Sequence, residues 1–337
     1  MTGPVRIAVL GVGRIGRMHA ELIARRTPGA VLAAVQDVNG AAASEVGEGL
    51  GVSHTTDVAT VMASPDVDAV AICSSTDTHV ELLVAAARAG KAIMCEKPIS
   101  LDLGTVDRAL AEVAEAGVPL QIGFNRRFDP AHRSVRDAVA SGAVGDVHLV
   151  RITSRDPAPP PIDYVKVSGG LFLDMTIHDF DMARYVVGSE VVDVFARAAV
   201  RVDPAIGEAG DVDTAVVVLT HANGCITTID NSRRAVYGYD QRVEAFGSAG
   251  MASSLNPVTH TGVLSTAEGT TAATIPYFFL DRYIPSYVAE WIAFTDMVRS
   301  GGTSPVTAAD GRAPLVIGLA AWRSVREGRV VRCDEIG

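Results

Sequence analysis

The sequence predicts an α/β domain built on a doubly wound parallel sheet, followed by an α+β domain. In the first part of the chain, short apolar segments without polar alternation are each followed by a helical segment, which is typical of a parallel sheet covered on both faces. From about Asp146 onward, strand patterns follow one another and are joined by Gly and Asn turns, which indicates an antiparallel sheet. A chain of 337 residues, 48% hydrophobic and 20% charged, fits two such globular domains.

The strand–helix alternation of the first domain begins almost at the N-terminus, and we assign residues 1–124 to this domain. Its expected strands are Val5–Leu10, Val31–Gln36, Ser53–Thr55, Val67–Cys73, Ala92–Cys95 and Pro119–Phe124, and the expected helices end near Arg26, Leu50, Met62, Ala89 and Ala116. In open parallel sheets, a ligand binds beyond the carboxyl ends of the strands.

Three glycines in the first strand–helix turn indicate a dinucleotide site. Gly11, Gly13 and Gly16 form a G-x-G-x-x-G pattern that contains Arg14 and Ile15. The first glycine makes the tight turn, the second lets a pyrophosphate approach the backbone, and the third lets helix and strand pack. With a strand before it and a helix after it, the pattern predicts a Rossmann domain. The alternative is a glycine-rich turn in a cofactor-free α/β domain.

Asp37, at the end of the second strand, is expected to accept hydrogen bonds from the adenosine ribose of the cofactor. Its carboxylate would repel the 2′-phosphate of NADP, and Val38, Asn39 and Gly40 provide no cation to neutralise that phosphate. We therefore expect NAD as the cofactor. Arg14 is the cation close enough in the glycine loop to complicate this preference.

Polar residues follow three later strands, at the sheet edge where the ligand is expected. They are Ser74, Ser75, Thr76 and His79 after the fourth strand, Glu96, Lys97 and Pro98 after the fifth, and Asn125, Arg126 and Arg127 after the sixth. We assign the polar residues after the fourth and fifth strands to the cofactor site. His79 opens a helix, where capping or packing is a simpler role than catalysis.

Lys97 is expected where a nicotinamide ring would lie, at the mouth of the sheet. An ammonium group there can hydrogen-bond the reacting oxygen of a substrate and favour its alkoxide character. Pro98 fixes the backbone after Lys97 and suits a rigid turn with a cis bond. The alternative is a solvated lysine without a chemical role.

The stretch from Gly170 to Asp179 predicts a helix with a buried face that carries an acid and a base on one side. Asp174 and His178 stand four residues apart, one helical turn. A carboxylate at that distance can fix the tautomer of the imidazole and stabilise its protonated form, which is what a proton acceptor for an alcohol needs. The alternative is a surface ion pair on a helix.

The second domain, residues 125–337, is expected to bind substrate and to form the oligomer interface. Its expected strands are 147–154, 191–202, 212–221, 225–232, 240–247 and 262–267, and its last two helices are expected near 286–299 and 312–327. An arrangement in which these helices pack back on the first domain is left open. The proline run Pro157–Pro161 is interpreted as a stiff loop wall, with a polyproline ligand as the alternative.

The composition argues for a small partner in a reducing compartment. A net charge of −10 without any block of Lys or Arg argues against nucleic acid and anionic membrane surfaces. The four cysteines stand far apart without a C-x-x-C pair, which indicates reduced thiols in a cytoplasmic protein. The first core strand leaves no room for a signal peptide, and no apolar run is long enough to cross a membrane.

Taken together, several motifs resemble the glucose–fructose oxidoreductase (Gfo/Idh/MocA) family over essentially the whole chain, and within it they are most similar to inositol dehydrogenases. The motifs are Gly11-x-Gly13-x-x-Gly16, Glu96-Lys97-Pro98, Gly123 to Pro130, Arg155-Asp156-Pro157, Gly169 to Asp179, and Asp281-Arg282-Tyr283. The resemblance implies a Rossmann domain, a second domain with a large open antiparallel sheet, NAD(P) as cofactor, and homotetramers built through that sheet. It also implies Lys97, Asp174 and His178 as the catalytic residues.

The expected reaction is oxidation of one ring hydroxyl of a cyclic polyol, for myo-inositol to the 2-keto compound, with hydride passing to C4 of the nicotinamide. His178 accepts the hydroxyl proton, Asp174 orients and charges the imidazole, and Lys97 binds the reacting oxygen. The residues nominated to hold the substrate are Arg127, Asp156, Asp174, His178, Tyr237 and Tyr283. The role of Tyr283 is in doubt because Asp281 stands where the family often has Glu.

Three alternatives remain open from the sequence. One is a dehydrogenase of the same fold acting on scyllo-inositol, an aldose or an anhydrosugar. Another is a non-catalytic nicotinamide-binding regulator, against which stands the presence of all three catalytic residue types. The third is a metal site at Asp174, His178, Asp179 and Asp181, although adjacent helical positions point away from one another; the expected mechanism requires no metal.

Overall fold

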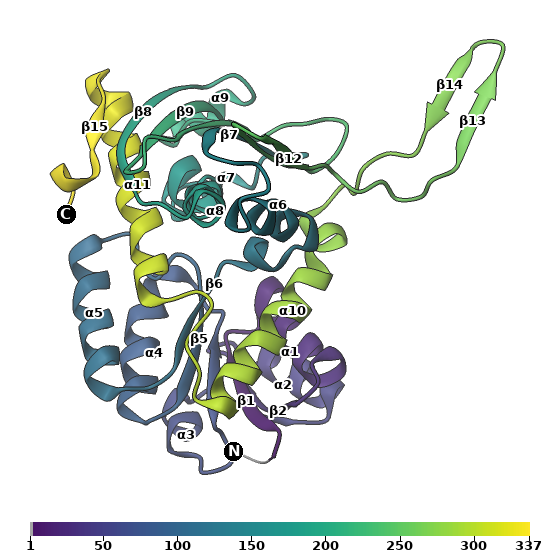
Figure 1. Ribbon diagram of the computed structural model, residues 1–337. Helices are drawn as coiled ribbons and strands as arrows, with labels where there is room; N and C mark the ends of the chain where they lie inside the picture. The colour runs from purple at the N-terminus through teal and green to yellow at the C-terminus, as the bar shows by residue number, and fades with distance from the viewer. Residues whose placement is uncertain (1–2) are drawn as a thin grey trace. The chain divides into compact units, whose positions relative to one another are not determined.

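The computed structural model describes residues 3–337, which form two compact units (Figure 1). Unit 1 contains the chain up to Asn125 together with the later segment Ser286–Ala313. Unit 2 contains Arg126–Pro285 and Pro314–Gly337. The second half of the chain therefore contributes a segment to the first unit.

Unit 1 contains a six-stranded sheet in the order β3-β2-β1-β4-β5-β6, and each neighbouring pair is parallel. This is the strand order of a dinucleotide-binding fold, so the predicted doubly wound α/β class is confirmed. The elements are β1 Val5–Leu10, α1 Arg14–Arg26, β2 Ala30–Gln36, α2 Gly40–Leu50, β3 Ser53–Thr55, α3 Val58–Ala63, β4 Ala69–Ile72, α4 Thr76–Arg88, β5 Ala92–Glu96, α5 Leu103–Ala116 and β6 Leu120–Gly123.

Local sequence explains where these elements start and stop. All four residues of β4 are fully buried, as expected for a central strand with helices on both faces. Asn39 and Asp57 cap α2 and α3 by accepting hydrogen bonds from two backbone N–H groups each. Helices α2 and α5 end at Gly51 and Gly117, whose φ angles of 70° and 66° suit glycine best.

The returning segment of unit 1 is bonded to the parallel-sheet elements. Trp291, in helix α10 (Phe279–Ser300), is fully buried and donates from Nε1 to Nδ1 of His19 on α1 at 2.8 Å. Farther along, Val306 O accepts from the backbone N–H of Ile122 in β6 at 3.1 Å. The segment is therefore bonded to helix α1 through Trp291 and to strand β6 through Val306.

Unit 2 is built on a seven-stranded sheet in the order β12-β11-β7-β10-β9-β8-β15. Its strands are β7 Val147–Arg155, β8 Val191–Ala199, β9 Thr214–His221, β10 Ile226–Ser232, β11 Asp240–Gly247, β12 Gly250–Ser254 and β15 Val331–Arg332. The neighbouring pairs are antiparallel except β7 and β10, which are parallel with Ile226 opposite Leu149. The fully antiparallel sheet expected from the sequence is therefore corrected to a mixed one.

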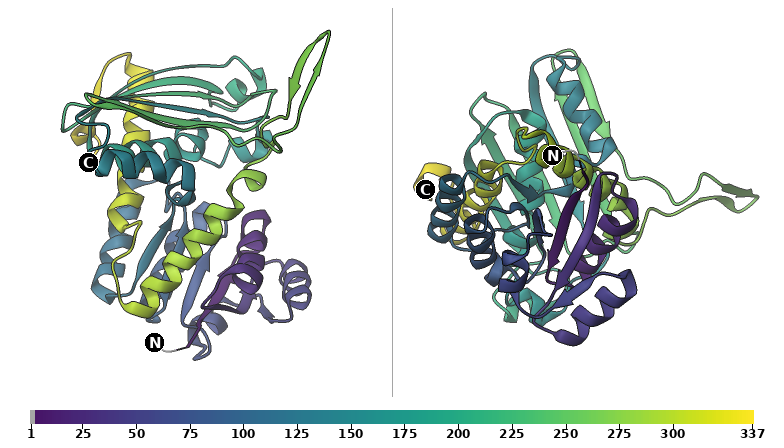
Figure 2. Two further views of the ribbon diagram at one scale, coloured as in Figure 1. Left: turned by 45° about the vertical axis from the view of Figure 1, so that its right-hand side comes forward. Right: turned by 90° about the horizontal axis from the view of Figure 1, so that it is seen from below.

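Helices cover one face of this sheet (Figure 2). The helical elements that lie wholly or partly in unit 2 are η1 Asn125–Phe128, α6 Pro130–Ala140, α7 Ile162–Val165, η2 Leu171–Met175, α8 Ile177–Val187, α9 Pro204–Glu208, α10 Phe279–Ser300, α11 Ala308–Glu327 and η3 Cys333–Glu335. One apolar core joins Val135 of α6 and Phe180 of α8 to sheet residues such as Val150 and Val217. No helix described between residues 3 and 337 meets the length and apolarity that a membrane span requires.

A separate two-stranded hairpin leaves the sheet after β12. It consists of β13 (Val263–Thr266) and β14 (Gly269–Ala272), which pair with each other in a sheet of their own. The sequence placed residues 262–267 in the main sheet, and this expectation is wrong. The alternation of residues predicted a strand correctly, but alternation alone does not identify the strand with which it pairs.

Candidate functional site

The glycine loop of unit 1 has the shape that a pyrophosphate needs. Gly11 has a φ of 84°, and a Cβ on it would lie 2.5 Å from Cα of Ser74. A Cβ on Gly16 would lie well inside contact distance of the Gly11 carbonyl oxygen. At Gly13, by contrast, a Cβ would meet no atom within 4 Å, and no side chain caps the N-terminus of α1 that Gly13 begins. The loop therefore offers open space over uncapped backbone N–H groups, and the residues present fit a dinucleotide.

Asp37 ties the end of β2 to this loop. Its Oδ2 accepts from the backbone N–H of Val12, and its Oδ1 accepts from that of Asn39, both at 2.8 Å. Each carboxylate oxygen can accept a further hydrogen bond. The side chain is thus held in a fixed position beside the loop with acceptor capacity left for ribose hydroxyls.

The side chain of His79 contacts the backbone of the loop after β4. Ring nitrogens Nδ1 and Nε2 of His79 lie 2.9 Å from Pro98 O and 3.1 Å from Ser74 O, and the residue is buried. Burial lowers the pKa of this imidazole and favours its neutral form. Both ring nitrogens of His79 thus lie at backbone carbonyl oxygens of unit 1, and a contact of this residue with the cofactor stays a prediction.

Lys97 is partly exposed at the end of β5, and its peptide bond to Pro98 is cis. The preceding Glu96 lies in a short polar chain that fixes a tautomer. Trp291 donates to Nδ1 of His19, so a neutral His19 carries its proton on Nε2 and donates to Oε1 of Glu96 at 2.8 Å. Gly123 lies against the same carboxyl, because a Cβ there would be 3.0 Å from it. The residue that precedes Lys97 is thus fixed, because the Glu96 carboxyl is hydrogen-bonded to His19 and packed against Gly123.

In unit 2, Asp174 and His178 lie on two helical segments rather than on one. Asp174 belongs to the π-helical turn η2, whereas His178 is the second residue of α8. The continuous α-helix predicted from the sequence is therefore wrong. Gly170 begins the π turn with a φ of 75°, and a Cβ there would lie 2.5 Å from Oδ1 of Asp211, so packing around Gly170 overrides the regular spacing.

Both residues nevertheless face away from the core. From Leu171 to Phe180, Asp174 and His178 are the two partly exposed residues, and the other eight are buried. A segment that buries everything except one acid and one imidazole presents those two groups as its polar surface. Partial exposure leaves both groups accessible to a bound molecule, which proton transfer requires.

Two residues that sequence reasoning missed hold the Asp174 carboxylate. Tyr164, in α7, donates its hydroxyl to Oδ1 at 2.9 Å, and Arg233 donates from Nη1 to Oδ2 at 3.2 Å. Tyr164 stands shortly after the proline run Pro157–Pro161, and this position beside the predicted loop wall could have suggested a role for it. Arg233 stands beside Arg234 after β10, and the sequence does not distinguish the buried arginine from the exposed one.

Arg233 is the centre of a cluster of three carboxylates. Besides Asp174, its guanidinium nitrogens lie 3.8 Å from Asp156 Oδ2 and 3.9 Å from Asp211 Oδ2. Burial raises the pKa of Asp156 to about 6, although Arg233 opposes this increase and Asp174 adds to it. Burial also raises the pKa of Asp211. Asp156 therefore changes charge close to neutral pH, within the environment of Asp174.

Arg126 and Arg127 form buried ion pairs with the acids that follow His178. Arg126 Nη1 donates to Asp179 Oδ1 at 2.7 Å, and Arg127 donates from Nε and Nη2 to both oxygens of Asp181 at 2.8 and 2.6 Å. Asn231 donates to the second oxygen of Asp179. Asp179 and Asp181 thus point toward arginines and do not converge with Asp174 and His178 as the metal alternative requires.

The two tyrosines nominated for the substrate differ in their placement. Tyr237 is 50% exposed, and its hydroxyl donates to Asp240 Oδ2 at 2.7 Å while Arg155 donates to it at 3.1 Å. Tyr283 is 1% exposed, and its hydroxyl lies 3.2 Å from Nε2 of His132. Tyr283 is thus buried and bonded inside unit 2, and its contact with substrate stays a prediction.

A cavity of about 430 Å³ lies beside the start of η2 within unit 2. Gly170 and Asp211 are part of its wall, with Trp322 and Arg326 from α11. Arg233 connects this wall to Asp174, but the catalytic candidates do not line the cavity. The cavity is therefore separate from Asp174 and His178.

Comparison with known proteins identifies the family of this chain. Residues 5–124 match the model of an oxidoreductase family with an NAD-binding Rossmann fold, and residues 132–253 match the GFO/IDH/MocA C-terminal domain. A myo-inositol 2-dehydrogenase from Thermotoga maritima is 50% identical over 98% of this chain and 99% of its own length. An inositol 2-dehydrogenase from Rhizobium meliloti is 46% identical over 97% of this chain and 98% of its own length.

Solved structures give the same result. The crystal structure of a probable dehydrogenase from Thermotoga maritima has a TM-score of 0.97 at 50% identity and covers 99% of this chain and 100% of its own. A scyllo-inositol dehydrogenase from Lactobacillus casei, with bound NAD(H) and scyllo-inositol, has a TM-score of 0.92 at 29% identity and covers 98% of this chain and 99% of its own. The chain is an NAD-dependent oxidoreductase of the Gfo/Idh/MocA family.

Proposed function

We propose that this protein oxidises a ring hydroxyl of a cyclic polyol with NAD, and that its substrate is myo-inositol, which becomes the 2-keto compound scyllo-inosose. The observation that carries the proposal is whole-length similarity at 46 to 50% identity to two relatives named as inositol dehydrogenases, in a chain that retains Lys97, Asp174 and His178. Asp174 and His178 are the partly exposed groups of an otherwise buried segment.

The three catalytic candidates have distinct tasks in this proposal. Bound NAD supplies the acceptor for the hydride that leaves the substrate carbon. His178 takes the hydroxyl proton at its ring, and Asp174 stabilises the resulting imidazolium by its negative charge. The ammonium of Lys97 donates a hydrogen bond to the reacting oxygen as negative charge develops on it.

The remaining hydroxyls need paired donors and acceptors. We propose Asp156 as an acceptor, Tyr237 as a half-exposed donor and acceptor, and Arg127 as a donor oriented by Asp181. A site built on such hydrogen bonds rejects analogues that lack a hydroxyl, because its polar groups would then remain unpaired.

A panel of substrates tests this proposal. We expect NADH to appear with myo-inositol at a kcat/KM well above that for scyllo-inositol, glucose and xylose. Scyllo-inositol is the strongest rival, because the Lactobacillus casei structure binds it. A higher kcat/KM for scyllo-inositol would replace the substrate within the same reaction, and NAD binding without turnover of any of the four would favour a regulator.

The same assay with NADP tests the role of Asp37. Its carboxylate is fixed by Val12 and Asn39, so it cannot easily turn away from a 2′-phosphate. We expect kcat/KM to be higher with NAD than with NADP. Equal or better use of NADP would show that Asp37 does not face the ribose.

The pKa of Asp156 predicts part of the decrease in kcat/KM at acid pH. Because this pKa is raised to about 6, the carboxyl is neutral below pH 6 and charged above it, and it loses acceptor strength as pH falls. Asp156→Asn should remove one ionisation and make the acid limb of kcat/KM less steep. Asp163→Asn is the control, because that side chain is 97% exposed; an unchanged slope in Asp156→Asn would contradict the assignment.

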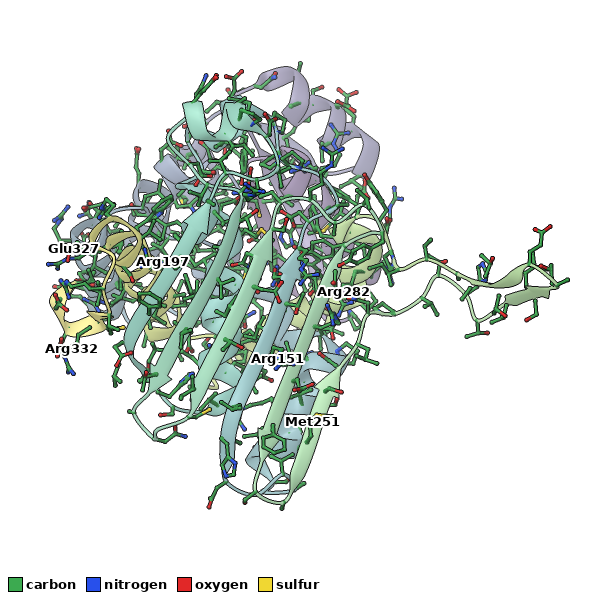
Figure 3. The ribbon with its side chains drawn as sticks, turned by 90° about the horizontal axis from the view of Figure 1, so that it is seen from above. Arg151, Arg197, Met251, Arg282, Glu327 and Arg332 are labelled. Carbon is green, nitrogen blue, oxygen red and sulfur yellow. The ribbon has the colours of Figure 1, made fainter. Side chains whose placement is uncertain are left out.

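We propose a homotetramer assembled through the sheet of unit 2. The sheet face seen in Figure 3 has its strands in the foreground, with Arg151 and Met251 on it. Strand pairing places Met251, Phe246, Leu149 and Ile226 in one row across four strands, and each of these side chains is exposed. A row of exposed apolar residues on one sheet face is typical of a protein interface.

We also propose that the protein works in the cytoplasm. All four cysteines are free thiols, and burial raises the pKa of Cys73 and Cys95, which keeps both protonated and unreactive. Free buried thiols suit a reducing compartment.

A further inference from the structure

The hairpin β13–β14 belongs to an arm, residues 257–274, that leaves unit 2 and extends away from its sheet (Figures 1 and 3). Every residue from 257 to 272 is exposed. Within unit 2 the arm is the segment at the right of Figure 1, beyond the edge strand β12. It therefore buries almost none of its own side chains.

The arm is poor in charged residues and carries exposed aliphatic side chains. Glu268 is its single acidic residue, and it contains no Lys or Arg, whereas 20% of the whole chain is charged. Val258, Val263 and Leu264 are 48%, 61% and 65% exposed. Depletion of charge combined with exposed aliphatic side chains is typical of the core of a protein interface.

An isolated hairpin of this kind is not stable in water. Two strands without a third strand or a packed helix are marginal, and ordering each residue costs about 1–2 kcal/mol of backbone entropy. Val263 pairs with Ala272 on one face, and Leu264 pairs with Thr271 on the other. Neither face contains a large apolar area, so a surface that covers Val263 and Leu264 would stabilise the hairpin.

The arm is anchored firmly at its root. Thr259 donates its backbone N–H to Thr274 O at 3.0 Å and closes the base. Tyr239 donates its backbone N–H to Pro276 O at 2.9 Å, and a Cβ on Gly238 would lie 2.6 Å from Ile275. The root is thus fixed to the loop after β10, and the arm is presented in a defined direction rather than as a free tail.

We infer that the arm docks on a second copy of this chain and buries Val263 and Leu264 there. A second copy is the occupant because the arm begins where β12 ends, and β12 carries Met251 of the apolar row proposed above as the sheet interface. The arm continues that uncharged surface beyond the sheet edge. The inference rests on the proposed assembly, and it is independent of the substrate.

The first test is excision of the arm. Because Thr259 and Thr274 are bonded to each other, residues 260–273 can be replaced by Asn-Gly, which suits a tight turn. Ile275 and Pro276 remain, so the contacts at Gly238 and Tyr239 are kept. We expect sedimentation over a dilution series to give an assembly with a dissociation constant raised at least about tenfold, the effect of losing about 1.4 kcal/mol of contact.

A point variant tests the same contact if excision of the arm disturbs folding. Leu264→Asp keeps the hairpin but places a charge in the docked surface, so it should also raise the dissociation constant about tenfold or more. Val330→Asp is the matched control, because Val330 is 50% exposed and precedes β15 at the opposite sheet edge. We expect the control to assemble like the unmodified chain.

Hydrogen exchange locates the contact. In the assembled full-length protein, the amides of residues 263–272 should exchange slowly, and they should exchange quickly after dilution below the dissociation constant. Exchange at the rate of an open peptide in the assembled protein, or an unchanged dissociation constant for Leu264→Asp, would overturn the inference. Both measurements are made without substrate, so they remain informative if the polyol panel fails.

Discussion

His178→Ala is expected to lower kcat for the polyol by about 10²–10⁴-fold, the usual contribution of a positioned general base. The imidazole is one of the two partly exposed groups of a buried segment, so its removal leaves the hydroxyl proton without an acceptor while the surrounding core stays packed. The dissociation constant for NAD should change little, because the glycine loop and Asp37 belong to unit 1. Steady-state kinetics and a fluorescence titration with NADH measure the two quantities.

The control is His54→Ala, which removes an exposed imidazole from β3 and should leave kcat unchanged. Added imidazole should restore part of the activity of His178→Ala but not of an unfolded protein. A kcat equal to that of the unmodified enzyme would remove His178 from the mechanism.

Arg233→Met is expected to lower the free energy of unfolding by about 3–5 kcal/mol at pH 7.5, the usual cost of leaving buried charges without their partner. Methionine fills much of the space of the arginine side chain but removes the cation shared by Asp174, Asp156 and Asp211. Urea unfolding measures the change. The loss should be smaller at pH 5, because Asp156, with its pKa raised to about 6, is then mostly protonated and needs no cation.

Arg234→Met is the matched control at the next residue. Arg234 is exposed, so its removal should change the free energy of unfolding by no more than about 0.5 kcal/mol. If both variants lost the same small amount at both pH values, Arg233 would not be the centre of the acid cluster.

Local spacing determined much of unit 1. The glycine pattern, the buried strands and Asp37 are all set within a few residues of one another, and the structure confirms the parallel sheet and its dinucleotide-binding strand order. Such features depend on backbone geometry that neighbouring residues impose, so a sequence is sufficient to predict them.

The environment of the proposed catalytic groups required the tertiary structure. Period alone predicted one helix through Asp174 and His178, but packing at Gly170 accompanies a π turn that contains Asp174 and ends before His178. Arg233 and Tyr164 reach Asp174 from positions 59 and 10 residues away. Long-range pairing of this kind depends on which side chains the fold buries together.

The sequence by itself determined the family resemblance, the cofactor loop and the identities of Lys97, Asp174 and His178 as candidates. The tertiary structure decided that Arg233 rather than Arg234 is buried, that Ser286–Ala313 joins unit 1, and that residues 263–272 form a hairpin outside the main sheet. The physical reason is that burial and strand partners are properties of the whole chain, because each depends on surfaces that distant segments provide.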